Sequence, residues 1–398
     1  MSVSTKETDS TESLNVFNRK YTMRRYPTQH SKELRAWDSA DLYLLNTTLE
    51  ELKPFEGTRI EEQAHSICIL NDTFGALTIP LLDHTAHQVL IYGDSWMSRQ
   101  ALETNHELNG ISKNYRFEES LESLIEDHSA PSLVIGRVPK SSAHLSYILN
   151  RLNSWLAPDT LLLLGGMDKH LSRGQFELLE KHFGPSKFMP GVKKARIWRS
   201  LCDKSLKSTQ HVTSSRVIEL PTHKLRLTAL PNVFSHDKLD MGSRFLIDRL
   251  AMIPQAHHVA DMACGYGILG LAYLHRYPKA RLIFCDESFQ AVESTRANLD
   301  MNHPDADAVA YADDGLKRVE SASLDLVLCN PPFHQQHTVS TDIARSLFRD
   351  AHRALVRGGE LWVIANQHLG YHIDLSRLFS RCETVASDKK FVLLRATR

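Results

Sequence analysis

The sequence lacks the usual marks of an exported, membrane-spanning or metal-binding protein. Its six cysteines are scattered over 398 residues, and none has the C-x-x-C spacing of a zinc site. No run of about 18 apolar residues occurs, and the N-terminus, MSVSTKETDSTESLN, has no apolar signal-peptide core. We therefore expect a cytoplasmic protein with reduced thiols, no membrane span and no bound metal.

An excess of either charge is also missing, since Lys and Arg total 47 and Asp and Glu total 47. Any surface for an acidic partner must then be a local patch. Such a patch is predicted in residues 19–35, RKYTMRRYPTQHSKELR, where basic side chains alternate with Tyr21 and Tyr26. These side chains would bind phosphates and stack on unpaired bases. The alternative is the solvated edge of a strand.

What the sequence does contain is one pattern written twice. Residues 66–82, SICILNDTFGALTIPLL, match residues 258–274, HVADMACGYGILGLAYL, and later segments match in the same order. Among them, HQVLIYGDS matches ARLIFCDES, which sets Asp94 opposite Asp286. Each copy alternates short apolar strands with helical stretches, the pattern of a mostly parallel sheet covered on both faces. We predict an α/β protein with two tandem Rossmann-like domains, residues 1–205 and 216–398.

One helix is predicted in detail. Ile343, Leu347, Ala351 and Leu355 recur at helical spacing in residues 341–359, and two glycines follow them. Glycine readily adopts the left-handed conformation that ends helices, so the helix is predicted to stop at residues 358–359.

The two copies differ where chemistry is expected. The second copy has Asp261, a glycine-rich turn and the sequence Asn-Pro-Pro-Phe. At the matching places the first copy has Ile69, Thr73 and the sequence RVPK. The first domain is therefore predicted to be degenerate, and the second to be the working one.

The turn VADMACGYGILG predicts a nucleoside-bearing cofactor. Gly265, Gly267 and Gly270 fit G-x-G-x-x-G between a strand and a helix, and Asp286 follows about 20 residues later, where a carboxylate can accept both ribose hydroxyls. This pattern alone leaves NAD and S-adenosylmethionine open. Asp261 favours S-adenosylmethionine, because a carboxylate before the first glycine suits a cationic ligand.

A second turn, Asn330-Pro331-Pro332-Phe333, ends the apolar segment SLDLVLC. The prolines fix φ and remove two N–H donors, so carbonyl oxygens and the amide oxygen of Asn330 remain as acceptors. Two fixed acceptors can hold an –NH2 group and aim its lone pair at a methyl donor. Phe333 offers a flat face on which a base can stack. We predict these four residues to be catalytic.

Other polar residues near these turns have two interpretations. Asp313, at the next strand end, would contact the adenine amino group or lie in a solvated turn. Cys264 and Cys329 are expected to pack as small apolar side chains. His334 and His337 have no further ligand cluster beside them, so we expect them to line the substrate entrance rather than hold a metal.

These motifs, together with PNVFSHDKLDMGSRFL (231–246) and ANQHLGY (365–371), resemble the ribosomal RNA guanine-N2 methyltransferases of class I, most closely those acting on the large-subunit (23S) RNA. The resemblance implies S-adenosylmethionine as cofactor, 23S ribosomal RNA as partner and a first domain that recognises RNA without binding the cofactor. It adds Phe234, Asp240 and Gly242 as residues that cover the cofactor or pack between domains. Ala263 stands where the family has a glycine, and we expect a small residue to be tolerated there.

The expected reaction is therefore methylation of the exocyclic N2 amine of one guanine in 23S rRNA by a monomer. Four alternatives stay open: a 16S rRNA guanine-N2 enzyme, a protein glutamine N5-methyltransferase, an NAD oxidoreductase, and a non-catalytic RNA-binding assembly factor.

Overall fold

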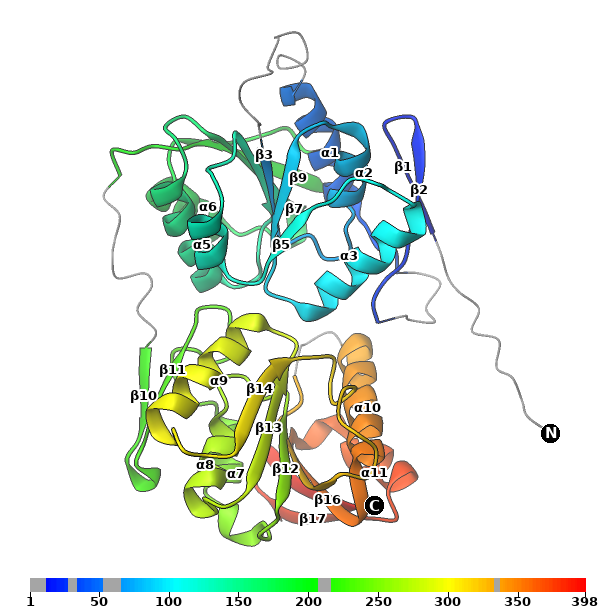
Figure 1. The fold of residues 1–398 in the computed structure, drawn as a ribbon, viewed down its shortest axis with the longest axis vertical. Helices are drawn as coiled ribbons and strands as arrows, with labels where there is room; N and C mark the ends of the chain where they lie inside the picture. The colour runs from blue at the N-terminus through cyan, green and yellow to red at the C-terminus, as the bar shows by residue number, and fades with distance from the viewer. Residues whose placement is uncertain (1–11, 28–33, 53–65, 207–215, 333–336) are drawn as a thin grey trace, which may run out of the picture. The chain divides into compact units, whose positions relative to one another are not determined.

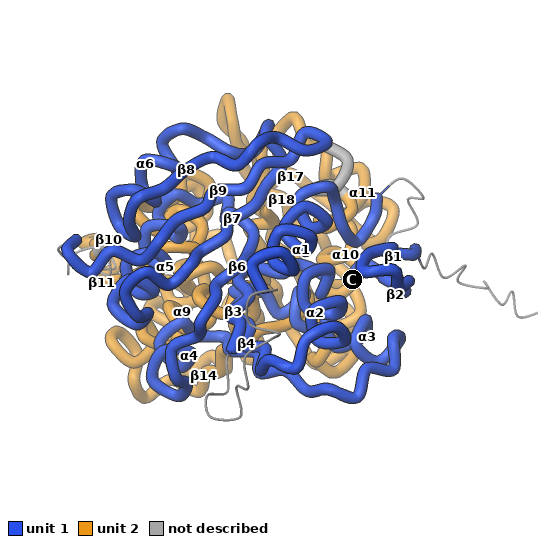
Figure 2. The backbone as a smooth tube through the Cα atoms, turned by 90° about the horizontal axis from the view of Figure 1, so that it is seen from above, with its two compact units in different colours: residues 1–213 blue, residues 214–398 orange. Residues whose placement is uncertain are grey.

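A computed structural model describes residues 12–27, 34–52, 66–206, 216–332 and 337–398 (Figure 1). The chain divides into two compact units, residues 1–213 and 214–398 (Figure 2). Each unit has its own seven-stranded sheet. Within the described ranges, no helix is both long and apolar enough to cross a bilayer.

In the first unit the strand order is β5-β4-β3-β6-β7-β9-β8. The five strands from β5 to β7 are parallel, whereas β9 runs antiparallel to both β7 and β8. A separate hairpin, β1–β2, precedes the sheet. The elements are β1 (Glu12–Val16), β2 (Arg19–Met23), α1 (Ser39–Leu52), β3 (Ser66–Leu70), α2 (Thr78–His84), β4 (Gln88–Tyr92), α3 (Trp96–Asn109), β5 (Arg116–Glu118), α4 (Leu121–Asp127), β6 (Leu133–Arg137), α5 (Ser142–Trp155), β7 (Leu161–Met167), η2 (Asp168–His170), α6 (Arg173–His182), β8 (Ser186–Phe188) and β9 (Ala195–Leu201).

The second unit repeats this topology with the order β14-β13-β12-β15-β16-β18-β17, again with a preceding hairpin, β10–β11. The confirmed fold class is thus α/β with two tandem Rossmann-like methyltransferase folds. The elements are β10 (Arg216–Leu220), η3 (Pro221–His223), β11 (Leu225–Ala229), α7 (Met241–Ile247), η4 (Leu250–Met252), β12 (His258–Met262), α8 (Ile268–Arg276), β13 (Arg281–Asp286), α9 (Phe289–Asn302), β14 (Ala308–Ala312), β15 (Leu324–Cys329), α10 (His337–Ala354), β16 (Leu355–Asn366), η5 (Gln367–Leu369), α11 (Tyr371–Leu378), β17 (Arg381–Ser387) and β18 (Phe391–Thr397).

Both faces of the second sheet are buried. Successive strand residues point to opposite faces. Leu328 and Ile364 accordingly join the core under α7, α8 and α9, while Cys329 and Val363 join the core under α10 and α11. Because β12 runs parallel to both β13 and β15, the carboxyl ends of these strands share one edge of the sheet. Parallel α/β sheets bind their ligands at this edge.

The duplication includes the hairpins, and each hairpin is hydrogen-bonded to an asparagine side chain of the third α-helix after it, α3 or α9. In the first unit, Asn105 Oδ1 accepts a bond from the Arg24 N–H at 2.8 Å. In the second unit, Asn298 Oδ1 accepts one from the Thr228 N–H at 2.8 Å. Such matched side-chain contacts indicate one ancestral unit copied whole.

The predicted end of the long helix is wrong. Helix α10 ends at Ala354, and the chain enters β16 directly at Leu355. Gly358, with φ of 83°, lies inside β16, where the pairing with β15 is irregular. The glycine therefore serves a strand irregularity, in which a positive φ is equally useful.

Candidate active site

The glycine loop joins β12 to α8 and is tied to the acid after β13. Gly265 and Gly267 have φ of 57° and 82°, in the left-handed region that favours glycine. The Gly265 N–H donates to Asp286 Oδ2 at 2.9 Å, and the Ser288 N–H donates to Oδ1 at 3.0 Å. Two backbone donors thus fix the Asp286 carboxylate beside the loop, although burial raises its pKa.

Room for a ligand exists beside the loop. Among the described residues, a Cβ added at Gly265 would meet only one atom within 4 Å, a methyl carbon of Val233 at 3.9 Å. Gly270 is different, because its added Cβ would lie 2.3 Å from the Phe284 ring. Gly265 therefore leaves space for a cofactor, whereas Gly270 allows α8 to pack on β13.

Asp261 is a buried carboxyl that lacks half of its hydrogen bonds. Its Oδ2 accepts the Gly270 N–H at 2.8 Å, and the side chain is fully buried. Its Oδ1 has no partner among the described residues. Burial, with the nearby charge of Asp286, raises the Asp261 pKa to about 8. A buried acceptor of this kind fits the positively charged amino group of S-adenosylmethionine.

One residue of the loop that is not a glycine also has a left-handed backbone conformation. Ala263 has φ of 58°, and Asn71 has φ of 56° at the matching place in the first unit. An alanine in this region costs roughly 1–2 kcal/mol. The loop conformation therefore tolerates a small residue at a position where glycine is the unstrained choice.

Asn330 follows the end of β15, next to the glycine loop, because β15 pairs with β12. Its Nδ2 donates to Asp240 Oδ2 at 3.1 Å and to Ser243 Oγ at 3.0 Å. Its Oδ1 is buried and, within the described ranges, has no partner. The amide is thus held by its nitrogen, so its oxygen is available to accept a hydrogen bond from a ligand. Pro331 beside it is buried.

Asp240 holds Asn330 through the start of α7. It caps this helix by accepting the Ser243 N–H at 2.8 Å, and the same oxygen accepts the Asn330 amide. A Cβ at Gly242 would lie 2.9 Å from that oxygen, so a larger residue there would disturb the contact. Sequence reasoning missed Ser243; its spacing in Asp-x-x-Ser, three residues after a helix-capping acid, was the available signal.

The other residues predicted for the site differ in burial and in contacts. Asp313 is buried, and its two carboxylate oxygens accept the Asp314 and Arg318 N–H groups at 2.9 and 3.0 Å. Phe234 is 57% exposed. Pro332 is half-buried. Phe333 and His334 lie outside the described residues.

The cysteines beside the site lie in the core. Cys264 and Cys329 are buried, and burial raises the pKa of both thiols well above the ordinary value. A protonated buried thiol is a poor nucleophile. No group of three or more His, Cys, Asp or Glu side chains that could hold a metal occurs in the described part of the chain.

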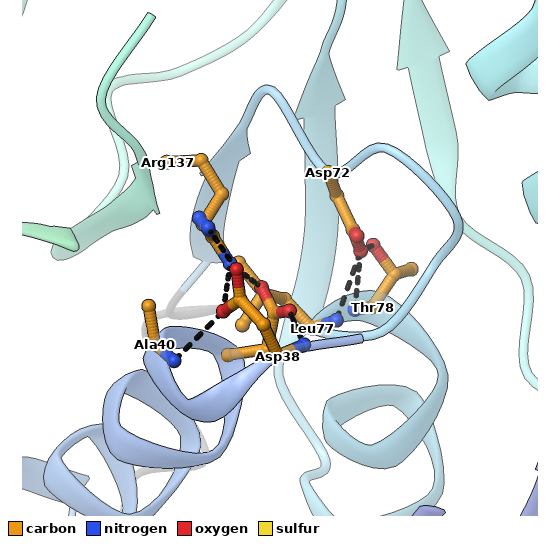
Figure 3. Close-up of polar contacts among 7 residues, drawn as sticks. Asp38, Ala40, Asp72, Leu77, Thr78 and Arg137 are labelled. Carbon is orange, nitrogen blue, oxygen red and sulfur yellow. Dashed lines mark hydrogen bonds and ion pairs between the residues drawn. The ribbon is translucent and has the colours of Figure 1, made fainter. Parts of the chain in front are cut away.

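The first unit has a different group at the place of Asn330. Strand β6 pairs with β3 as far as Gly136, and β15 pairs with β12 as far as Cys329, at corresponding places. The next residues, Arg137 and Asn330, therefore occupy the same position in the two units. Arg137 donates to Asp38 at 2.8 Å through both terminal nitrogens (Figure 3). It also donates to Asp41 at 2.6 Å. Burial raises the pKa of Asp41 to about 6, whereas Arg137 holds the pKa of Asp38 below its ordinary value.

The loop of the first unit is also closed by a side chain. Asp72, which matches Cys264, accepts the Leu77 N–H at 3.1 Å and the Thr78 N–H at 2.8 Å (Figure 3). The Asp72 carboxylate is thus hydrogen-bonded to the free N–H groups at the start of α2. An anion bound at a helix start satisfies the free N–H groups there.

The expected match of Asp94 with Asp286 is wrong by one residue. The ladders pair Leu70 with Tyr92 and Met262 with Cys285, so Gly93 stands where the second unit has Asp286. The position that corresponds to Asp286 is therefore a glycine, which has no carboxylate to accept ribose hydroxyls.

The predicted stacking of Tyr21 in the basic N-terminal patch is also wrong. Tyr21 is 3% exposed, and its hydroxyl donates to Asp83 at 2.9 Å. The Arg25 guanidinium lies 4.6 Å from the centre of the Phe74 ring and donates to the Arg35 carbonyl. Much of this patch packs the β1–β2 hairpin onto the first unit.

Comparison with known proteins agrees with this geometry. The model for the Methyltransferase small domain matches residues 224–395, and the model for the RLMG N-terminal domain matches residues 11–204. The chain is similar to ribosomal RNA large subunit methyltransferase G of Ectopseudomonas mendocina, with 41% identity over 94% of this chain and 96% of that protein. The protein of the same name from Psychromonas ingrahamii is 35% identical over 97% of this chain and 99% of its own length.

One solved structure resembles the chain over nearly its whole length. It is a T. thermophilus 16S rRNA N2 G1207 methyltransferase in complex with AdoMet and guanosine. Its TM-score is 0.74 and its identity 19%, with 98% of each chain covered. At this identity the likeness supports the fold, namely two tandem methyltransferase-like units.

Proposed function

Because the chain belongs to the family of ribosomal RNA large subunit methyltransferase G and is an S-adenosylmethionine-dependent rRNA methyltransferase, we propose that it methylates the exocyclic N2 amine of one guanine in 23S rRNA. The observation that carries the amine chemistry is the geometry of Asn330. Its nitrogen is held by Asp240 and Ser243, and its oxygen is left buried without a partner among the described residues.

In this reaction Asn330 Oδ1 accepts one N–H of the guanine amine. A nucleobase amine is a weak nucleophile because its lone pair is delocalised into the ring, so orientation of that lone pair accelerates attack. Bound S-adenosylmethionine supplies an electrophilic methyl group on sulfur. Asn330 would orient the amine nitrogen toward that methyl group, and the methylated nitrogen would lose its extra proton to water. Pro331 and Pro332 keep the turn rigid and free of competing N–H donors.

The proposed cofactor contacts follow the carboxyl edge of the sheet. Asp286 accepts the ribose hydroxyls, and Gly265 with Gly267 lets the backbone approach the ligand. Asp261 offers its free oxygen to the ammonium group. Asp313 contacts the adenine amino group.

Two further aromatic contacts are proposed. Phe234, which is more than half exposed, covers the cofactor, and Phe333 stacks on the flipped guanine. Stacking of one base is worth roughly 1–3 kcal/mol, which offsets much of the cost of unstacking it from RNA.

We also propose that residues 1–205 recognise RNA while residues 216–398 bind the cofactor and catalyse. Phe188 supports this role, because its ring is 48% exposed and stacked on Phe176 at a centroid distance of 3.9 Å. The Arg196 guanidinium lies 5.7 Å from the Phe188 ring centre, beside a hollow of about 710 Å³. Exposed Lys193 and Lys194 follow on the same β8–β9 connection. Asp168, Glu177 and Glu180 also line this hollow, and Arg196 pairs with Asp168 at 2.9 Å, so the exposed Phe188 ring carries the proposal, because it can stack on an unpaired base.

The proposal further places the protein in the cytoplasm as a monomer. The amine chemistry is tested by incubating unmodified 23S rRNA with labelled S-adenosylmethionine and digesting the RNA to nucleosides. Label should appear in N2-methylguanosine. An Asn330→Ala variant with equal cofactor occupancy should produce almost none. Label in any other nucleoside would contradict the assignment of the N2 amine.

A further inference from the structure

Asn366, the last residue of β16, has a buried side-chain oxygen whose hydrogen bonding needs an explanation. Its Oδ1 is buried and finds no partner in the part of the chain that the structure describes. A buried acceptor without a hydrogen bond is rare, because its desolvation is not compensated. An acceptor of this kind at the ligand-binding edge of a parallel sheet points to a ligand donor.

Asn366 shares that edge with Asn330. Strands β15 and β16 are parallel neighbours and pair Cys329 with Val363, so Asn330 stands level with Ile364. Asn366 is two residues further along. With strands about 4.8 Å apart and a rise of about 3.3 Å per residue, the two Cα atoms are roughly 8 Å apart. Both side chains can therefore reach one base.

The two asparagines also face the same layer. Leu328 and Ile364 belong to the core on the α7 side, and each lies two residues before one of the asparagines. A Cβ at Gly242 of α7 would lie 3.6 Å from Ile364 and 3.4 Å from Phe391, the residue paired with Asn366. The start of α7, which holds Asn330, thus borders Asn366.

Two neighbouring acceptors match the edge that guanine presents. The Watson–Crick edge of guanine places its N1–H donor directly beside the N2 amine, whereas adenine has an acceptor at N1. We propose that Asn366 Oδ1 accepts the guanine N1–H while Asn330 Oδ1 accepts an N2–H, which makes Asn366 a specificity-determining residue. This inference rests on the proposed function.

The first unit supports the pairing of these two roles. Met167 matches Asn366, because the Asp168 N–H donates to the backbone carbonyl of Lys194 and the Gln367 N–H to that of Lys390, at corresponding places. The unit that has Arg137 instead of Asn330 therefore has a thioether side chain instead of the second amide. Both acceptors are absent from these positions together.

The test uses two variants and two substrates. The methylated guanine is mapped first, and a short RNA spanning it is made with guanine or 2-aminopurine at that position. 2-Aminopurine keeps the amine but has no N1–H. Asn366→Ala removes the acceptor, whereas Asn366→Asp keeps an acceptor oxygen in the same place.

We expect Asn366→Ala to lower kcat/KM on guanine about tenfold or more, and wild type to fall similarly on 2-aminopurine. Asn366→Ala should lose nothing further on 2-aminopurine, since the bond is already absent. Asn366→Asp should keep most activity on guanine, and all variants should bind S-adenosylmethionine equally. The inference about Asn366 would be overturned, with the proposed function intact, by either of two results. One is that the losses from Asn366→Ala and from 2-aminopurine multiply; the other is that Asn366→Ala keeps full activity on guanine. Failure of wild type to methylate the guanine RNA would overturn the proposed function itself.

Discussion

Arg137 and Asn330 occupy the same position at the ends of corresponding strands in the two sheets. Each donates hydrogen bonds to the start of the first helix of its own unit. The Asn330 amide keeps one oxygen as an acceptor, whereas a guanidinium has donors only. The arginine position therefore cannot receive an amine.

The acceptors of these hydrogen bonds also differ between the two units. In the second unit the acceptors are Asp240 and Ser243, and in the first unit they are Asp38 and Asp41, with the same spacing of three residues. A second carboxylate thus replaces the serine where a cation replaces the amide. At this position the first unit therefore has an ion-pair group in place of an amide acceptor.

Removal of this cation should destabilise the first unit. Arg137→Ala leaves two carboxylates without their cation, and Asp41 is nearly buried. Breaking a buried ion pair costs about 3–5 kcal/mol, and we expect about 2–4 because Arg137 is partly exposed. Urea unfolding can be followed by tryptophan fluorescence, since Trp37, Trp96, Trp155 and Trp198 lie in this unit and only Trp362 lies in the other.

The control for this measurement is Arg173→Ala. Arg173 is 90% exposed and pairs with Glu177 on the surface of α6, so its loss should change stability by less than about 0.5 kcal/mol. Equal effects of the two substitutions would show that the ion-pair group contributes no net stability. Affinity for S-adenosylmethionine should be unchanged in both.

Asn330→Ala should separate binding from turnover. The side chain has no proposed contact with the cofactor, so affinity for S-adenosylmethionine should stay within about twofold. Loss of an oriented acceptor costs about 10²–10³ in kcat at comparable sites. Ser243→Ala removes one of the two bonds that fix the amide and should give a smaller loss, also in kcat. Isothermal titration and single-turnover methyl transfer measure the two quantities. A loss of cofactor affinity parallel to the loss of rate would contradict the proposed role of Asn330 as an acceptor for the substrate amine.

Asp261 predicts an unusual dependence of stability on pH. Its folded pKa, about 8, is above the unfolded value of about 3.9. Between these values the folded state keeps a proton that the unfolded state releases, so this carboxyl lowers stability as pH rises, by up to about 1.4 kcal/mol per unit. Asp261→Asn stays neutral, so its stability relative to wild type should increase from pH 5.5 to 7.5. Urea unfolding without cofactor, followed by circular dichroism, tests this; parallel pH profiles would refute it.

Phe188 should affect RNA and not the cofactor. Removal of a stacking ring costs roughly 1–3 kcal/mol per base, so Phe188→Ala should raise KM for RNA about fivefold or more. Leu108, 41% exposed on α3, is a matched apolar control whose replacement by alanine should leave KM unchanged. If both variants bind RNA like wild type, the β8–β9 surface is not the RNA site.

The duplication and both turns of the second unit were predictable from sequence, because glycine, proline and strand periodicity are local signals. The match of Asp94 with Asp286 was an error of one residue in the alignment, because HQVLIYGDS and ARLIFCDES, set against each other without a gap, already place Gly93 opposite Asp286, as the ladders do. The burial of Tyr21 depends on how a hairpin packs. Ser243 had a sequence signal, its spacing from the capping acid Asp240, but its hydrogen bond to Asn330 depends on the fold. The role proposed for Asn366 rests on an oxygen without a partner among the described residues, which the sequence does not show.

The central claim concerns the substrate, and parallel methyl transfer tests it most directly. Naked 23S rRNA, naked 16S rRNA, assembled subunits and a protein glutamine substrate are each incubated with labelled S-adenosylmethionine and the enzyme. The account predicts label in 23S rRNA, recovered as N2-methylguanosine. Label in 16S rRNA alone, or in protein glutamine alone, would contradict it.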